Sequence, residues 1–96
     1  MASVVVSPTA QRNLATLIET HSLPDSTTER VRRALEPLGH FPLLGATLEG
    51  RWAGFRFIVG PWRWMIVLYR YDEADDRVAI VTIRDGRSAR ARKTSR

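Results

Sequence analysis

The feature that most constrains the fold of this chain is a long apolar segment, residues 54–69, which Gly60-Pro61 interrupts. Aromatic and aliphatic residues dominate both halves, and a Gly-Pro pair between two such runs is typical of a turn, so the segment predicts a β-hairpin. Each half carries one arginine, Arg56 and Arg63. Because a guanidinium keeps its charge and needs an anion or water beside it, a sheet with two of them is a candidate anion-binding surface. Nucleic acid is the polyanion that we expect there.

The length of this turn decides how the two arginines lie relative to each other. If the turn has only two residues, Val59 pairs with Trp62 in the ladder. Residues on opposed positions of a ladder share one side of the sheet, so Arg56 and Arg63 are then expected on the same face.

The following hairpin, whose turn falls in the acidic run 72–76, leaves two alternatives open. A five-residue loop brings Asp85 to the face of Arg63, whereas a loop one residue shorter brings Arg84 there. The first arrangement would neutralise the surface as an ion pair, and the second would make it a cationic cluster. The acidic run itself is expected to be a solvated turn.

Helical patterns dominate the first half of the chain. A short strand at residues 4–6 is followed by Ser7 and Pro8, which mark the start of a helix to about residue 21. A capping box at residues 26–29 predicts a second helix, which Pro37 should kink or end. We expect an α+β fold in which two helices cover one face of an antiparallel β-meander. The expected meander strands are 48–52, 55–59, 62–71 and 77–83.

Size and charge narrow the class of protein. The chain has 96 residues, 44% of them hydrophobic, which is enough for one core and one domain. The net charge is +5, and the excess lies in residues 49–96, where basic residues outnumber acidic ones by eleven to six. We expect a domain at residues 1–88 and a basic, flexible tail at residues 89–96. An intracellular, cytoplasmic protein is predicted, because the sequence has no cysteine, no signal peptide and no apolar run of about 18 residues.

No cofactor or metal is expected from the sequence. His21 and His40 have no partner at metal-ligand spacing, and each should lie at a helix end, where the side chain would contact the last carbonyl groups. Neither a nucleophile triad nor a glycine-rich phosphate loop is visible.

The three tryptophans have two possible uses, packing in the core and stacking on bases. Trp62 and Trp64 alternate on an expected central strand, which favours core packing. Trp52 lies near the expected rim and is the better candidate for stacking on a base. In the tail, Arg90 could hold phosphate or could serve solubility, and both alternatives stay open.

The order strand, helix, helix, meander is accompanied by a set of short motifs. The motifs are Leu48-x-Gly50, Gly54-Phe55-Arg56, Gly60-x-Trp62-Arg63 and Tyr69. Together these features resemble the RelE/ParE superfamily of type II toxin–antitoxin toxins over about residues 3–88. The resemblance implies a small toxin that a cognate antitoxin protein holds inactive. RelE-like members of that family cut messenger RNA in the ribosomal A site, and ParE-like members block DNA gyrase.

Residue by residue, the resemblance implies a phosphate-clamping catalytic set in which Arg56 and Arg63 match the family's sheet arginines. Arg84 or Arg87 matches the arginine of its last strand. The RNA- or phosphate-binding set would be Arg51, Trp52 and Arg90. The chain departs from the pattern at Ile58 and Asp85-Gly86, and residues 88–96 contain no aromatic residue.

Arginines suit one part of RNA cleavage and not the rest. They stabilise charge on a phosphate, but they are poor general bases, and the sequence shows no convincing group for proton transfer. The favoured hypothesis is ribosome-dependent mRNA cleavage by an mRNA interferase. A ParE-like inhibitor of DNA gyrase and a catalytically inactive toxin-fold binding module are the alternatives. Arg56 and Arg63 could also only staple the sheet by pairing with Asp85, Asp72 or Glu49.

Overall fold

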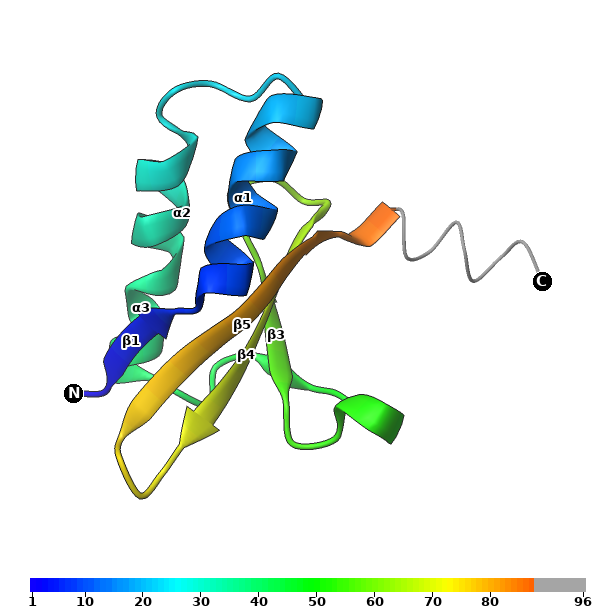
Figure 1. The fold of residues 1–96 in the computed structure, drawn as a ribbon. Coiled ribbons are helices and arrows are strands. Elements are labelled where there is room, and N and C mark those ends of the chain that lie inside the picture. Colours follow the sequence, from blue (N-terminus) through cyan, green and yellow to red (C-terminus); the bar gives the residue numbers. More distant parts are fainter. Residues whose placement is uncertain (88–96) are drawn as a thin grey trace.

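The computed structural model describes residues 1–87, which form an α+β fold with helices on one face of a five-stranded sheet (Figure 1). The predicted fold class is therefore confirmed. The predictions for the basic tail, including Arg90, lie outside the described residues. The elements in chain order are β1 (Ser3–Val6), α1 (Pro8–Thr20), α2 (Thr27–Leu35), α3 (Pro37–His40), β2 (Ala46–Thr47), the 3-10 turn η1 (Gly50–Trp52), β3 (Arg56–Val59), β4 (Met65–Asp72) and β5 (Arg77–Asp85).

The sheet has the strand order β1-β5-β4-β3-β2. The expected antiparallel meander is present as β3, β4 and β5, and β1 adds to it by pairing parallel to β5. The prediction of a strand at residues 48–52 is wrong. Only Ala46 and Thr47 pair with β3, and Gly50 follows with a φ of 68°, a left-handed conformation that turns the chain into η1.

The first hairpin also differs from its prediction. β3 ends at Val59 and β4 begins at Met65, so that Val59 lies opposite Ile66 instead of Trp62. The five residues between the strands form a wider turn, closed by a 2.8 Å hydrogen bond from the Gly60 amide to the Met65 carbonyl. Pro61 has no N–H to donate to a ladder, which explains why pairing stops there. Arg63 is therefore in a turn and does not share a sheet face with Arg56.

The second hairpin has the shorter of the two expected loops, because Asp72 lies opposite Arg77 and leaves a four-residue turn. The register then shifts between Leu68 and Tyr69, which was not expected. At this bulge β5 carries one extra residue, Val81, which lies between the partners of those two residues. Beyond the bulge Arg84 pairs with Ile66, and Asp85 pairs with the buried Met65.

Alternation along β4 assigns a face to each of these residues. Met65, Val67 and Tyr69 are fully buried and belong to the core under the helices. Ile66 and its ladder partner Arg84 therefore point to the opposite side, which we call the open face, whereas Asp85 points to the helix side. The core is completed by helical and strand residues, namely Leu14, Leu17, Val31, Leu35, Leu38, Val78, Ile80 and Ile83.

The helix ends confirm two of the sequence signals and correct one. The Ser7 hydroxyl accepts a 3.0 Å hydrogen bond from the Ala10 amide, as expected for an N-cap before proline. Pro37 does end the second helix, because α2 stops at Leu35 and the short α3 begins at the proline. The prediction of a capping box is wrong, because Ser26 makes no capping hydrogen bond. The hydroxyl of Thr27 instead donates to the Pro24 carbonyl at 2.6 Å.

Helix α1 runs along β5 and replaces a neighbouring strand where β1 has ended. The Ser7 hydroxyl donates to the Val81 carbonyl at 3.0 Å, and the Asn13 side-chain oxygen accepts from the Ile83 amide at 3.2 Å. Directly after α1 ends at Thr20, the C-cap residue His21 reaches Asp85 at the end of the same strand. The path of α1 along β5 thus carries a histidine to the carboxyl end of the last strand.

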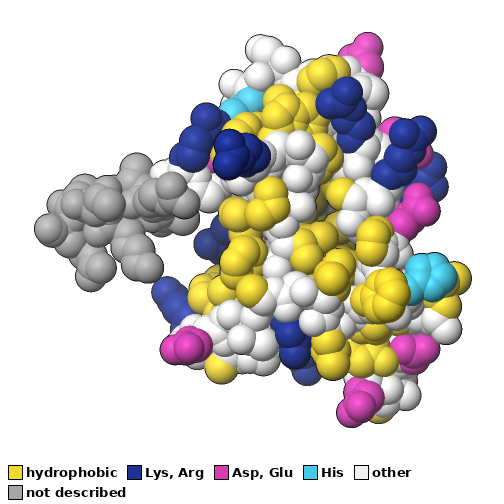
Figure 2. Space-filling model, turned by 180° about the vertical axis from the view of Figure 1, so that it is seen from behind, with side chains coloured by type: hydrophobic (Ala, Val, Ile, Leu, Met, Phe, Trp, Pro, Cys, Tyr) yellow, Lys and Arg dark blue, Asp and Glu magenta, His cyan; other side chains and the backbone are white. Residues whose placement is uncertain are grey.

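Apolar surface is extensive. Figure 2, which shows the molecule from behind, has a broad area of hydrophobic side chains in its middle, with basic side chains at several places around it. The most exposed large hydrophobic residues of the described part are Met1, Val5, Phe41, Leu43, Leu44 and Val59. Surface of this kind is common where another protein binds.

Candidate functional site

Two of the predicted arginines meet at a hollow of about 460 Å³ beside the turn between β3 and β4. We call it the arginine hollow, and its lining residues are Arg63, Trp64, Ile66, Gly86 and Arg87. The side chains of Arg63 and Arg87 are both exposed, and in residues 1–87 Arg63 has no ion-pair partner. Two guanidinium groups beside one hollow are suited to hold a phosphate or a carboxylate.

Gly86 shapes the floor of the arginine hollow. Its amide donates a 2.6 Å hydrogen bond to the Trp64 carbonyl, which extends the contact between the two chain segments past the end of β5. A Cβ at this position would come within 2.8 Å of Ile66. A larger residue would therefore displace Ile66 and change the hollow.

Asp85 organises the groups on the helix side of the hollow. It accepts hydrogen bonds from the Arg87 amide at 2.9 Å and from the Arg87 guanidinium at 3.3 Å, and it lies 3.0 Å from His21 Nε2. The hydrogen bonds from Arg87 lower the pKa of Asp85 to about 2, with a smaller contribution from His21, although partial burial opposes the change. Asp85 is therefore an anion at all physiological pH values.

His21 is held on three sides. Its ring stacks on Trp64 with 4.5 Å between the ring centres and 16° between the planes, its Nε2 faces Asp85, and its Nδ1 lies 2.9 Å from the Thr20 hydroxyl. The expectation that this side chain contacts the last helical carbonyls is wrong. The histidine and the aspartate are 64 positions apart, and only the bulge in β5 and the course of α1 bring them together.

Trp62 and Trp64 pack against the core as partly buried residues, as the sequence predicts, but they do so from the turn and not from a strand. They also contact cations: the guanidinium of Arg30 lies 5.6 Å from the ring centre of Trp62, and that of Arg87 lies 5.0 Å from Trp64. Both distances suit a cation–π interaction.

Arg56 is separate from this hollow. Its Nη1 donates to the carbonyl oxygens of Leu43 at 3.2 Å and Gly45 at 2.8 Å, and the neighbouring Tyr69 hydroxyl accepts from the Gly45 amide at 2.7 Å. These bonds fasten the loop before β2 to the sheet. The alternative that Arg56 staples the structure is therefore supported, although its partners are carbonyl groups and not the carboxylates proposed from the sequence.

Arg84 and Trp52 form a third group on the open face. The Arg84 guanidinium lies 5.2 Å from the ring centre of Trp52 beside a second hollow of about 500 Å³, which Thr82 and Asn13 also line. Arg51 is exposed in η1, next to Trp52. Since Ile66 lines the arginine hollow and pairs with Arg84, the two hollows adjoin across one pair of ladder residues.

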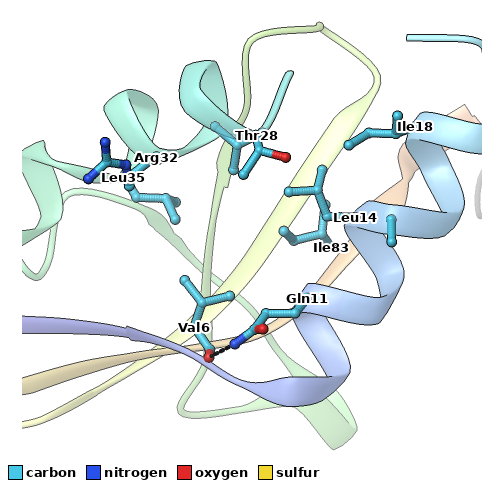
Figure 3. A pocket seen from close by; sticks show the side chains of 10 residues that line it. Val6, Gln11, Leu14, Ile18, Thr28, Arg32, Leu35 and Ile83 are labelled. Carbon is cyan, nitrogen blue, oxygen red and sulfur yellow. Dashed lines mark hydrogen bonds between the residues drawn. The ribbon is translucent and has the colours of Figure 1, made fainter. Parts of the chain in front are cut away.

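A groove between the two long helices was not expected from the sequence (Figure 3). Its walls are the facing sides of α1 and α2 and its floor is formed by β1 and β5, with a volume of about 460 Å³. We call it the helical groove. Most of its lining is apolar, and the residues are Val6, Gln11, Leu14, Ala15, Ile18, Thr28, Val31, Arg32, Leu35 and Ile83. Amphipathic patterns locate each helix stripe, but they do not tell how far apart two helices lie.

No helix within residues 1–87 is both long and apolar enough to cross a membrane. The same residues hold no group of three or more His, Cys, Asp or Glu side chains that could bind a metal ion.

Solved structures with the same fold include toxins and toxin–antitoxin complexes from bacteria. The RelBE2 complex from Mycobacterium tuberculosis contains a chain with 27% identity and a TM-score of 0.65, over 88% of this chain and 96% of that one. The YoeB/ParE toxin from Agrobacterium tumefaciens has 15% identity and a TM-score of 0.65, over 86% and 96% of the two chains. The RelBE complex from E. coli contains a chain with 12% identity and a TM-score of 0.62, over 86% of this chain and 94% of that one.

The architecture is thus that of a type II toxin of the RelE/ParE superfamily. A family model described as the ParE toxin of the type II toxin–antitoxin system parDE matches residues 4–90, and the chain belongs to this family. A search of curated proteins gave no match.

Proposed function

We propose that this protein is a toxin that arrests growth when it is free and is silent when a cognate antitoxin covers it. The observation that carries this proposal is the match to the ParE toxin family over residues 4–90. Two of the similar solved structures are complexes of a toxin with its antitoxin, which supports a partner of the same kind here.

The helical groove is the place where we expect the antitoxin to bind. Its apolar lining is open to solvent between α1 and α2, and Arg32 lies at its border. Arg32 and Arg33 are both more than 70% exposed. An amphipathic helix fits this surface, with apolar side chains in the groove and acidic ones toward the arginines. The short edge strands β1 and β2 leave room for strand pairing as a further contact.

The target that the geometry favours is messenger RNA on the ribosome. Arg63 and Arg87 flank the arginine hollow, and Arg84 lies beside the adjoining second hollow, beyond its ladder partner Ile66. Fixed donors of this kind stabilise charge that develops on a phosphate during cleavage. Arg56 is excluded from the phosphate clamp in this proposal, because it is bound to backbone carbonyls.

Inhibition of DNA gyrase is the second candidate. The observation that favours it is that the family model matching the chain is that of the ParE toxin, whose branch of the superfamily acts on gyrase. On this alternative the exposed arginines would contact gyrase and cleave nothing.

Copurification tests the toxin–antitoxin part of the proposal. The chain would be coexpressed with a candidate antitoxin, a small acidic protein sought in the adjacent reading frame, and both growth and complex formation would be measured. Rescue of growth together with a stable complex is expected. A partner that neither copurifies nor rescues growth would contradict the proposal.

The target is tested by inducing the protein in a bacterial host. Pulse labelling follows protein and DNA synthesis, and mapping of mRNA 5′ ends detects new cuts. Prompt loss of translation with cuts inside codons is expected. Filamentous cells, a DNA-damage response and intact messages would assign the protein to gyrase inhibition.

A further inference from the structure

The charge of Asp85 determines which ring nitrogen of His21 carries the proton. Because Asp85 is ionised, its oxygen can only accept a hydrogen bond, so Nε2 of His21 must carry the proton that joins them at 3.0 Å. A neutral imidazole with a proton on Nε2 has a free lone pair on Nδ1. A carboxylate that fixes one ring nitrogen in this way leaves the other nitrogen ready to accept a proton.

Nδ1 already faces a hydroxyl group. The Thr20 side-chain oxygen lies 2.9 Å from it, and this contact is exposed at the surface of the molecule. With Nδ1 as the acceptor, the threonine hydroxyl is the donor. A hydroxyl from a substrate could take the same position by displacing Thr20, which is an exposed side chain at the end of α1.

The surroundings of His21 connect it to the arginine hollow. Its ring lies flat on Trp64, which lines the hollow, and its partner Asp85 is bonded to Arg87, which also lines it. The charged groups joined to the histidine are Asp85, which it contacts directly, and Arg87, which is bonded to Asp85. Arg63 lines the hollow together with Trp64. His21 does not itself line the hollow, but Trp64 and Asp85 connect it to the two arginines that do.

We propose that His21 is the proton-transfer residue of an RNA-cleaving site at the arginine hollow and that Asp85 is its positioning residue. This inference rests on the proposed action on messenger RNA. Nδ1 takes the proton of a ribose 2′-hydroxyl, and the 2′-oxygen forms a bond to the adjacent phosphorus. The bond from phosphorus to the 5′-oxygen breaks, the 5′-oxygen takes a proton from water, and the products are a 2′,3′-cyclic phosphate and a 5′-hydroxyl end. Arg63 and Arg87 stabilise the charge on the phosphate.

The test uses His21→Gln, because a glutamine amide can still donate to Asp85 but cannot transfer a proton. Purified wild-type protein and variants are added to ribosomes that carry a defined mRNA, and new 5′ ends are counted over time. His21→Gln should lower the cleavage rate by about 100-fold or more, the usual effect of losing a general base. The matched control is His40→Gln, which changes an exposed helix-terminal histidine at a distance from the hollow and should cleave at the wild-type rate.

A pH profile separates proton transfer from a purely structural role. The wild-type rate should rise with pH, because only an uncharged imidazole can accept the proton, and the residual rate of His21→Gln should lack this rise. Asp85→Asn should lower the rate less than His21→Gln does, because it removes the positioning residue and leaves the imidazole in place.

The outcomes distinguish this inference from the function on which it rests. If the wild type cleaves and His21→Gln cleaves within threefold of it, or if both share one pH profile, His21 is not the proton-transfer residue and the proposed function stands. If the wild type makes no cuts on programmed ribosomes, the inference and the mRNA target are both wrong.

Discussion

Arg63 and Arg56 differ in what their guanidinium groups contact, and this difference predicts different effects of mutation. Arg63 is exposed in a turn without an ion-pair partner in residues 1–87, so Arg63→Ala should abolish toxicity and change the free energy of unfolding by less than about 0.5 kcal/mol. Arg63→Lys should restore little toxicity if two parallel hydrogen bonds to phosphate are needed. Growth arrest and urea unfolding measure the two effects. An Arg63→Ala protein that is unfolded, with full toxicity in any folded fraction, would make this arginine a structural residue.

Arg56→Ala should lower stability and leave toxicity unchanged, which is the reverse of the result expected for Arg63→Ala. It removes two hydrogen bonds to the carbonyl oxygens of Leu43 and Gly45, so the free energy of unfolding should fall by about 1–2 kcal/mol. Toxicity measured per folded molecule should stay near that of the wild type. A stable Arg56→Ala protein without toxicity would instead place this arginine in the phosphate clamp.

Asp85 predicts a pH dependence of stability. Its pKa is lowered from 3.8 to about 2 in the folded protein, so its stabilising contribution is present above about pH 4 and is lost as the pH falls toward 2. Asp85→Asn should destabilise the protein by about 1 kcal/mol at neutral pH, a value reduced because Arg87 is exposed. At pH 2 wild type and variant should unfold at similar temperatures. An equal difference at both pH values would contradict the role of the carboxylate charge.

At the scale of elements, the helical groove offers a matched pair of substitutions on α1. Ala15 is exposed and lines the groove, whereas the adjacent Thr16 is exposed and does not line it. Ala15→Asp places a charge among apolar side chains and opposes an acidic partner, so it should weaken antitoxin binding by about tenfold or more. Thr16→Asp should leave the affinity unchanged. Isothermal titration with the purified antitoxin measures both, and an unchanged affinity for Ala15→Asp would place the antitoxin on another surface.

The order and class of the elements could be predicted from the sequence because apolar periodicity and turn residues are local signals. The start of α1 at Ser7-Pro8 and its end near His21 are examples. Register could not be predicted in the same way. Residues 78–83 are almost entirely apolar, so the extra residue Val81 leaves no mark in the pattern, although it decides that Arg84 faces the open side and Asp85 the helix side.

The candidate site could be predicted only in part, because the sequence signals for it are also local. The exposed arginines stand out as charges in apolar segments, but the sequence does not tell which of them share a hollow. Arg63 and Arg87 come together, whereas Arg56 is bound to a loop that precedes it by eleven to thirteen positions. His21 and Asp85 were missed as a pair, because their contact depends on α1, the bulge and the turn 60–64 at once.

For the whole molecule, the distribution of charge gives a prediction that does not depend on a single site. Residues 90–96 include four basic residues and no acidic one, which accounts for most of the net charge of +5. Removing residues 90–96 should weaken binding to RNA or ribosomes and lower the slope of log affinity against log salt by about 3, since each phosphate contact contributes about 0.7–0.9 to that slope. The melting temperature should not change. An unchanged slope in a filter-binding titration would give these residues a role in solubility only.

The course of α1 along β5 has a consequence for how copies of this protein meet one another. β5 is the longest strand, with nine residues, and β1 covers only four of them. Along the next part of the strand, the N-cap residue Ser7 and the helical residue Asn13 bind one carbonyl and one amide group of β5. A second copy that approached this edge would find those groups already occupied, which opposes extension of the sheet from one molecule to the next.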